Sequence, residues 1–271
     1  MSSAVLVNGE SQADPAHAIA SNDRGLNYGD GLFETALLCD GSVRFLQAHL
    51  LRLRDGCERL GIEYPGDERL IADIRVVSAA ERNGVVKILV TRGSGGRGYR
   101  PLPGIKSTRI VSLHPLPAPN SDVAFTARWC DVRLSRNPAL AGLKHLSRLE
   151  QVLAQLEWSD ATIGEGLMLD TEGELVCATA GNVFIVRNEM LVTPDLRYCG
   201  VRGVMRSQVL RVAAEIGVAA SEEPLWPHDL DTATEVFITN AVRGIRPLTA
   251  LAELRWEAGS LTRKLSAALE L

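Results

Sequence analysis

Lys144 is the residue whose position suggests chemistry most strongly, and it is one of only four lysines in the 271-residue chain. It follows a turn at Gly142 and precedes leucines at helical spacing, so the pattern predicts a helix with Lys144 in its first turn. A cation is disfavoured at that end of a helix, and an ammonium beside apolar surface loses proton affinity. Lys144 could therefore form a Schiff base, or it could be a snorkelling surface lysine. The leucines of this stripe are Leu143, Leu146, Leu149, Leu153 and Leu156.

Two glycine-rich segments could approach a ligand closely. Residues 21–36 hold three glycines before a predicted strand at 33–38, which is typical of a ligand loop or of a plain turn. Residues 91–99 follow a predicted strand at 85–90 and include Arg97 and Tyr99. No helix pattern follows them, so we expect a flexible loop that brings Arg97 to a carboxylate rather than a phosphate cradle. A disordered surface loop is the alternative.

A third segment is typical of an anion site. Residues 200–206 contain two glycines and open an amphipathic helix that extends to about residue 215 or 217. The first N–H groups of a helix have no partner within it, so they can bind an anion. The predicted strand 236–241 ends in a polar turn, which could supply further N–H groups. The spacing fits no Walker or dinucleotide motif, so this signal alone is weak.

Two domains are expected from the remaining pattern. The proline-rich residues 114–120 are the best candidate for a boundary, which gives a small N-terminal domain at 1–113, a linker at 114–121 and a C-terminal domain at 122–271. Turn pairs at Asn8-Gly9, Asp40-Gly41 and Glu172-Gly173 predict hairpins. Further elements are predicted as strands at 5–7, 110–113, 123–129, 167–169, 175–176 and 181–186, and as helices at 46–60 and 261–269.

Composition excludes several classes of protein. The net charge of −4 and the lack of a basic run argue against nucleic-acid binding. The N-terminus lacks a signal-peptide pattern, and no segment has the length of a membrane span. The odd number of cysteines, without a CxxC pair, favours reduced thiols in a cytoplasmic protein and no metal site. The five cysteines are Cys39, Cys57, Cys130, Cys177 and Cys199.

Three strings resemble a known family over nearly the whole chain. They are residues 28–36 (Tyr-Gly-Asp-Gly-Leu-Phe-Glu-Thr-Ala), 92–99 (Arg-Gly-Ser-Gly-Gly-Arg-Gly-Tyr) and 142–153 (Gly-Leu-Lys-His-Leu-Ser-Arg-Leu-Glu-Gln-Val-Leu). The chain resembles the fold-type IV pyridoxal-phosphate (PLP) enzymes, which include branched-chain and D-amino-acid aminotransferases and aminodeoxychorismate lyases. The last two strings are similar to those of the lyases. The resemblance implies an α/β (α+β) fold of two domains with the cofactor between them, and a homodimer.

The resemblance also implies roles for individual residues. Lys144 would be the Schiff-base lysine and proton-transfer base, and Thr35 would assist proton transfer. Arg97 and Tyr99 would receive a substrate carboxylate, with Tyr28 also among the substrate-binding residues. The residues that would hold the cofactor phosphate are Arg52, Gly203, Val204, Met205, Asn240 and Ala241.

One position departs from the family pattern. A glutamate that pairs with the pyridine nitrogen usually lies five residues before the Asn of an Asn-Val-Phe strand, and counting back from Asn182 gives Cys177. A thiol is a weak donor and a weak acceptor. Glu172 and Glu174 lie nearby but do not align. Cysteine in place of glutamate would make the pyridine ring of the cofactor a weaker electron acceptor. An aminotransferase depends on that ring more than a lyase does, because the product of the lyase becomes aromatic.

These observations lead to one expected function and two alternatives. We expect a PLP-dependent lyase that converts 4-amino-4-deoxychorismate to 4-aminobenzoate and pyruvate in folate biosynthesis. The first alternative is a branched-chain or D-amino-acid aminotransferase of the same fold. The second is a non-catalytic phosphate-binding protein.

Overall fold

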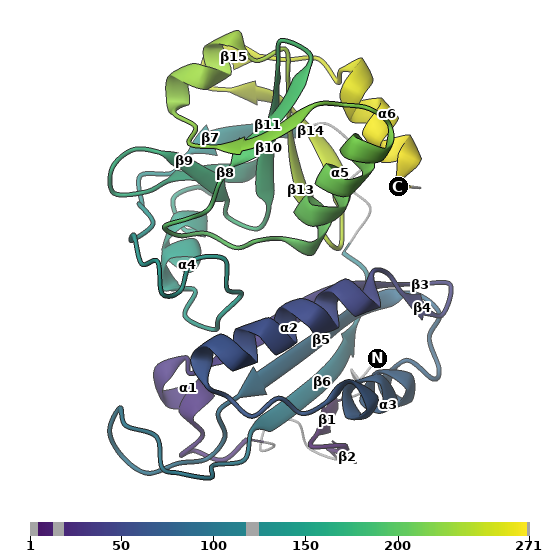
Figure 1. Cartoon of the computed structure of the whole chain (residues 1–271), viewed down its shortest axis with the longest axis vertical. Coiled ribbons are helices and arrows are strands. Elements are labelled where there is room, and N and C mark those ends of the chain that lie inside the picture. Colours follow the sequence, from purple (N-terminus) through teal and green to yellow (C-terminus); the bar gives the residue numbers. More distant parts are fainter. Residues whose placement is uncertain (1–4, 13–18, 118–124, 270–271) are drawn as a thin grey trace. The chain divides into compact units, whose positions relative to one another are not determined.

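The computed structural model describes residues 5–12, 19–117 and 125–269 (Figure 1). The chain forms two compact units, one of residues 1–119 with 144–147 and one of residues 120–143 with 148–271. The predicted linker 114–121 falls partly on residues 118–124, outside the described residues, so its bounds stay a prediction. Residues 144–147 were expected within the C-terminal domain, and their contacts instead assign them to the first unit.

The first unit is built on an antiparallel sheet, and Figure 1 shows a long helix lying across one face of it. In spatial order the strands are β2 (Glu10–Ser11), β1 (Val5–Val7), β6 (Thr108–His114), β5 (Gly84–Thr91), β3 (Gly31–Cys39) and β4 (Ser42–Val43). The helices are α1 (Arg24–Tyr28), α2 (Leu46–Leu60) and α3 (Asp67–Val77).

Alternation along β3 gives this sheet two different faces. Leu32 and Ala36 are buried, and Leu32 packs so closely against α2 that a Cβ at Gly56 would lie 2.8 Å from it. The residues between them, Phe33 and Thr35, are only half-buried. The sheet therefore has one face in the core and one accessible to a ligand.

The second unit is built on a mixed sheet. The path of strands is β12 (Ala220–Glu223), β11 (Met190–Pro194), β10 (Asn182–Arg187), β13 (Glu235–Asn240), β14 (Gly244–Leu251), β7 (Phe125–Trp129), β8 (Ile163–Leu169) and β9 (Leu175–Ala178), with β15 (Leu254–Arg255) paired to β14. Its helices are α4 (Leu149–Gln155), α5 (Val204–Glu215) and α6 (Ser260–Ala268), with the 3-10 helix η2 at Pro227–Thr232.

The core of the second unit is formed by strands whose sequences are continuous apolar runs, such as β10 and β13. Phe184 and Phe237 are fully buried and stack with ring centroids 5.0 Å apart. Helix α5 packs on β13 and on α6. This packing fixes where α5 begins relative to the ends of β10 and β13, and that junction belongs to the candidate site below.

Most predicted elements are present near their predicted bounds. The hairpin turns were predicted from Asn8-Gly9 and Asp40-Gly41, and all four of these residues adopt positive φ angles. Helices α2, α5 and α6 also lie close to their predicted ranges. The part of the predicted strand 123–129 that precedes Phe125 lies outside the described residues.

The predicted helix at Lys144 is wrong. Helix α4 begins at Leu149, and Lys144 lies in an extended segment before it. The reason is tertiary: the backbone of residues 144–146 is hydrogen-bonded to β3, so it is not available for a helical turn. The leucines Leu149, Leu153 and Leu156 do not form a buried stripe, since they are 75%, 54% and 75% exposed.

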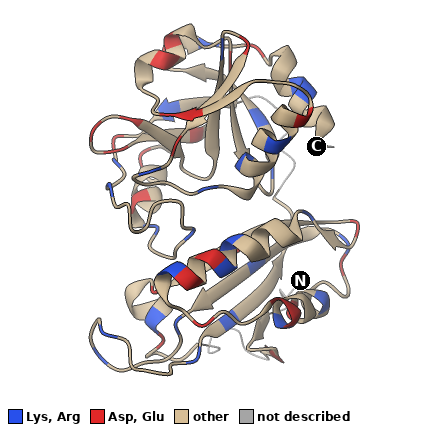
Figure 2. Ribbon diagram, in the orientation of Figure 1, with Lys and Arg blue, Asp and Glu red and all other residues tan. Residues whose placement is uncertain are grey.

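Figure 2 shows charged residues of both signs spread over the ribbon, with both signs present on α2. Across the ranges that the structure describes, no helix has both the length and the apolar character needed to cross a bilayer. The same ranges contain no group of three or more His, Cys, Asp or Glu side chains arranged to hold a metal ion.

Candidate active site

Lys144 is held by backbone pairing with the beginning of β3. The Phe33 N–H donates to the Lys144 carbonyl at 2.9 Å, and the Leu146 N–H donates to the Gly31 carbonyl at 2.9 Å. His145 forms an antiparallel bridge with Leu32 between these two bonds. The lysine segment therefore behaves as a short extra strand, which fixes its backbone more firmly than an exposed helix start would.

The glycines of residues 28–36 make this close pairing possible. A Cβ at Gly29 would lie 2.5 Å from the Ser147 Oγ, and one at Gly31 would lie 2.8 Å from the Leu146 Cδ1. Gly29 also has a φ of 65°, in the left-handed region that favours glycine. The expectation that these glycines allow a close approach is met by the lysine segment of the same chain.

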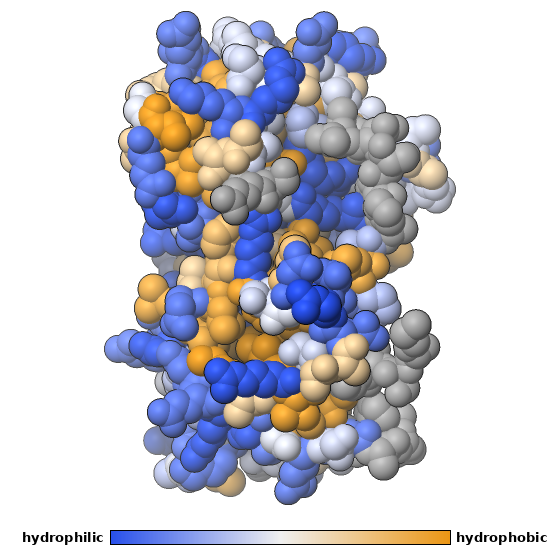
Figure 3. Space-filling model, turned by 90° about the vertical axis from the view of Figure 1, so that its right-hand side faces the viewer, coloured by the Kyte–Doolittle hydropathy of each residue, from blue (hydrophilic) through white to orange (hydrophobic). Residues whose placement is uncertain are grey.

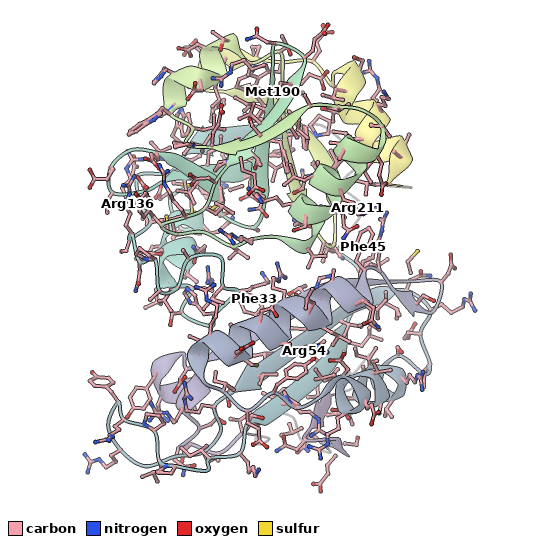
Figure 4. All side chains as sticks on the ribbon, in the orientation of Figure 1. Phe33, Phe45, Arg54, Arg136, Met190 and Arg211 are labelled. Carbon is pink, nitrogen blue, oxygen red and sulfur yellow. The ribbon has the colours of Figure 1, made fainter. Side chains whose placement is uncertain are left out.

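Lys144 and Thr35 share the accessible face of β3. The Lys144 Nζ lies 4.1 Å from the centroid of the Phe33 ring, whose side chain is labelled in Figure 4. Thr35 is two residues further along β3, so its side chain points to the same face. The two residues predicted to be catalytic are thus brought to one surface.

Lys87 lies on that face too, although sequence reasoning did not select it. Lys87 is the direct partner of Thr35 in the β3–β5 ladder, and its Nζ lies 6.0 Å from the Phe33 ring centroid. The alternation of β5 already indicated a half-buried lysine. Its proximity to Thr35 depends on the strand register, which the sequence alone does not give.

The loop that carries Arg97 and Tyr99 is anchored by Arg24. The Arg24 guanidinium donates to the Gly98 and Tyr99 carbonyls at 2.9 and 2.8 Å, and Arg24 also lies over the Tyr28 ring. Tyr28 packs edge-on against Tyr99, and its hydroxyl accepts a bond from the Gly98 N–H. Arg97 and Tyr99 are exposed, so their role with substrate stays a prediction.

Asp30 connects this loop to residues 21–36. Its carboxylate accepts bonds from Arg24 and Arg92 at 2.7–3.0 Å. Burial would raise the pKa of Asp30, but the hydrogen bonds and charges of the two arginines outweigh burial and lower it. Asp30 is therefore a charged clamp at neutral pH, and it holds both glycine-rich segments together.

Arg52 is bound to a buried carboxylate. Its Nε and Nη2 donate to the two oxygens of Glu34 at 2.7 and 2.5 Å. His49 approaches the same carboxylate through Nδ1 at 2.6 Å. The assignment of Arg52 to the cofactor phosphate stays a prediction, and Glu34 is a partner that the sequence did not reveal.

The second unit carries a cup of backbone at the start of α5. Gly203 is the N-cap of this helix and makes no side-chain capping bond, so the Val204 and Met205 N–H groups lack a partner within the helix. A Cβ at Gly203 would overlap the Asn182 Oδ1. Asn182 donates to the Val201 carbonyl at 2.8 Å and therefore ties the beginning of β10 to the segment before α5.

A second turn lies beside this cup. Asn182 is the ladder partner of Thr239, at the end of β13, and the Asn240 side chain accepts bonds from the Val242 and Arg243 N–H groups. The Thr239 hydroxyl is 1% exposed and has no hydrogen-bond partner among the described residues. An unpaired buried hydroxyl, a glycine without room for a Cβ and a free helix N-terminus together fit a phosphate group. Asn240 and Ala241 remain predicted ligands.

The segment before Lys144 runs past the same cup. The Gly142 N–H donates to the Gly200 carbonyl at 2.9 Å, and the Arg202 N–H donates back to the Gly142 carbonyl at 3.1 Å. Residue 142 is two positions before Lys144, and residue 202 precedes Gly203. These two bonds tie residue 142 to the segment that precedes the cup.

Cys177 lies on β9 in an apolar cluster that also contains Cys130 and Cys199. Burial raises the pKa of the Cys177 thiol, so it is neutral at physiological pH. Arg148 is its nearby charged group, and burial lowers the pKa of that guanidinium while Cys177 and Glu150 oppose the shift. Neither neighbouring glutamate replaces the missing one, since Glu174 is paired with Arg136 at 3.0 Å and Glu172 lies in the turn before β9.

Comparison with known proteins identifies the family. The amino-transferase class IV family matches residues 31–251, which is most of the chain. The chain belongs to this family. Among curated relatives, aminodeoxychorismate lyase of Vibrio harveyi is 31% identical over 261 residues, covering 93% of this chain and 95% of that protein. A putative branched-chain-amino-acid aminotransferase of Methanocaldococcus jannaschii is 33% identical over 251 residues, which cover 90% of this chain and 86% of that protein.

Solved structures of class IV proteins share the fold. The crystal structure of 4-amino-4-deoxychorismate lyase from Pseudomonas aeruginosa is 45% identical and covers 98% of each chain, with a TM-score of 0.92. The branched-chain amino acid aminotransferase of Escherichia coli has a TM-score of 0.87 at 22% identity, over 99% of this chain and 94% of that one. The second likeness shows the fold alone, and it confirms the expected α/β fold.

Proposed function

We propose that this class IV family member is a PLP-dependent lyase that converts 4-amino-4-deoxychorismate to 4-aminobenzoate and pyruvate, in folate biosynthesis. The observation that carries the proposal is the 45% identity to the Pseudomonas aeruginosa lyase over 98% of both chains. The site residues support it, because the lysine, a threonine on the same face and a phosphate cup are all present. The atoms of the substrate equal those of the two products, so the reaction needs no oxidant or co-substrate.

PLP supplies an aldehyde that captures amines and a pyridine ring that accepts electron density. In this chain the Val204 and Met205 N–H groups, with Asn240 and Ala241, would hold its phosphate, and Arg52 would add a charged donor. A phosphate dianion is stabilised by unpaired helix N–H groups and by the positive end of the helix. The unpaired Thr239 hydroxyl fits the same group.

Proton transfer is assigned to Lys144 and Thr35. Lys144 would take the proton from the ring carbon that bears the substrate amine, as a general base. Thr35 would assist delivery of a proton to the oxygen of the departing enolpyruvyl group. Both side chains lie on the accessible face of β3, next to Phe33, which supports a division of the two proton transfers between them.

The substrate carries two carboxylates, and the first unit offers cations for them. Arg97, with Tyr99 and Tyr28, would receive one carboxylate through a charge-assisted bond. Lys87, the ladder partner of Thr35, would be a second cation for a substrate carboxylate. A lyase for a dianionic substrate needs more than one such cation, since each carboxylate must exchange water for a charged partner on binding.

Cys177 favours the lyase over an aminotransferase. A neutral thiol cannot make the charge-assisted bond that a glutamate would make with the pyridine nitrogen, a bond worth about 1.5–3 kcal/mol. A reaction that ends in an aromatic product has its own driving force and tolerates that loss better than reversible amine transfer does.

A cytoplasmic homodimer completes the proposal. All five cysteines are free, which favours a reducing compartment. Helix α4 exposes Leu149, Val152 and Leu153, and Leu156 directly after the helix is exposed too. An apolar row of this kind is typical of a surface that another chain covers. Apolar side chains also reach the surface on the face drawn in Figure 3.

Product analysis tests the proposal. Purified, PLP-loaded protein is incubated with 4-amino-4-deoxychorismate, and 4-aminobenzoate and pyruvate are quantified together. We expect both products in equal amounts. A PLP-bound protein that forms neither product, but accumulates pyridoxamine phosphate with an amino acid donor, would show that the activity is aminotransfer instead.

A further inference from the structure

The first unit contains an ion cluster with a buried carboxylate, Glu34, that has no role in the proposed reaction. Glu34 and His49 are 1% and 0% exposed, and the Glu34 carboxylate contacts both His49 and Arg52. His49 and Arg52 are three residues apart on α2, so their side chains emerge from one face of the helix. Glu34 lies on β3, between Phe33 and Thr35, with its side chain on the opposite face of the sheet.

The cluster keeps its charge. Burial by itself would raise the pKa of Glu34, but the Arg52 charge, the His49 hydrogen bond and the Arg52 hydrogen bonds hold that pKa below its usual range. A buried ion pair is often no more stabilising than apolar side chains of the same volume. The presence of this ion cluster is therefore better explained by its orientation of Arg52 than by a contribution to stability.

Arg52 is the member of the cluster that is oriented. Two bonds from one edge of the guanidinium to the two Glu34 oxygens fix the plane of the group as well as its position. The Arg52 side chain is 16% exposed, against 1% for Glu34, so the guanidinium is the outermost part of the cluster.

His49 fixes the carboxylate in turn. Its Nδ1 lies 2.6 Å from the Glu34 Oε2, and its Nε2 is buried with no hydrogen-bond partner among the described residues. Among the described residues, the hydrogen bond of the ring is therefore the one with Glu34. The Glu34 carboxylate is therefore contacted by Arg52 at both oxygens and by His49 at Oε2, which restricts its rotation.

We infer that Glu34, supported by His49, is a positioning residue that presents the Arg52 guanidinium to the phosphate of PLP. This inference rests on the proposed function, because it takes Arg52 as a phosphate ligand. It adds that phosphate recognition depends on a carboxylate that does not itself touch the cofactor.

The test compares PLP with pyridoxal, which is the same aldehyde without the phosphate. Dissociation constants of both compounds are measured by absorbance for the wild-type protein, Glu34→Gln, Arg52→Ala and Asp73→Asn. Asp73→Asn is the matched control. Asp73 is a buried carboxylate of the same unit, but it lies on α3 and pairs with Arg109 of β6 at 2.7 Å. Circular dichroism checks that each variant is folded, and Glu34→Asp replaces Glu34→Gln if the latter does not fold.

We expect Glu34→Gln to weaken PLP binding by roughly tenfold, while pyridoxal binding changes less than about twofold. Asp73→Asn should leave the ratio of the two constants unchanged. A loss of the preference for PLP in Arg52→Ala but not in the Glu34 variant would overturn the inference and leave the phosphate role of Arg52 intact. An unchanged preference in Arg52→Ala would instead remove Arg52 from the phosphate site of the proposed function.

Discussion

The two units carry different kinds of candidate site residues. In the first unit, carboxylates are held by side-chain hydrogen bonds: Asp30 by Arg24 and Arg92, and Glu34 by Arg52 and His49. The second unit supplies backbone N–H groups at the start of α5 and a neutral thiol at Cys177.

This difference separates proton chemistry from anchoring. Side chains that move protons must be placed to within a fraction of an ångström, and ion pairs and strand pairing do that for Lys144 and its neighbours. Backbone N–H groups are fixed by the fold itself and carry no proton that titrates near neutral pH. Substitutions of Lys144 and Thr35 should therefore reduce turnover, whereas substitutions in the cup, like those of Arg52 and Glu34, should reduce affinity for the cofactor.

The largest effect is expected for Lys144→Ala. Loss of the general base should lower turnover by about three to four orders of magnitude, measured as 4-aminobenzoate formed per minute. Lys264→Ala, on the terminal helix α6, is the control and should keep wild-type turnover. Substantial turnover in Lys144→Ala would contradict the assignment of proton transfer to this residue.

Thr35→Val should have the next largest effect. The substitution removes the hydroxyl and keeps the shape, so kcat should fall by about a hundredfold with little change in KM. Steady-state kinetics on the folded variant make this measurement. A rise in KM at constant kcat would mean that Thr35 binds substrate and does not assist proton transfer.

Gly203→Ala tests the backbone cup of the second unit and should reduce affinity for the cofactor. The added methyl group would overlap the Asn182 side chain, and overpacking of this kind costs about 1–3 kcal/mol. PLP affinity should fall by roughly tenfold to a hundredfold, with kcat at saturating PLP near that of the wild type. Gly96→Ala is the control, because a Cβ there meets only Leu102 at 3.5 Å.

Cys177→Glu tests whether the neutral thiol limits amine transfer. A carboxylate beside Arg148 could pair with the pyridine nitrogen, and the conversion of PLP to pyridoxamine phosphate by amino acid donors should become about tenfold faster. Single-turnover absorbance follows this conversion. Equal rates in the two proteins would mean that another group already protonates the nitrogen.

The smallest effect is on acid stability. The pKa of Glu34 is lowered from 4.5, so its contribution to stability is fully present above about pH 4.5 and is lost as the pH falls through the lowered pKa. Urea unfolding followed by circular dichroism between pH 7 and pH 3 should show this acid loss. Glu34→Gln should be less stable at pH 7 and should lose less stability on acidification, so identical pH slopes would contradict the charge assignment.

Local sequence patterns predicted the helices and turns better than they predicted the tertiary pairing between these elements. Helices α2 and α5 and the turn at Asp40-Gly41 follow from periodicity and from residues that tolerate positive φ, which are properties of the local sequence. The helix at Lys144 was wrong because pairing with β3, more than a hundred positions earlier in the chain, overrides the leucine spacing.

Tertiary contacts also decided which residues of the candidate site the sequence could predict. Family resemblance selected Lys144 and Thr35, and the sheet brings them to one face. Lys87 and Glu34 were missed because their importance comes from the β3–β5 register and from the packing of α2 on β3. Neither relation can be read from residue types and spacing.

The central claim is that Lys144, and not Lys87 beside the same Phe33 ring, forms the bond to PLP. Borohydride reduction of the PLP-loaded protein, followed by proteolysis and mass spectrometry, tests this claim directly. The account predicts a single pyridoxyl label on the peptide that contains Lys144. A label on the Lys87 peptide, or none on either peptide, would contradict it.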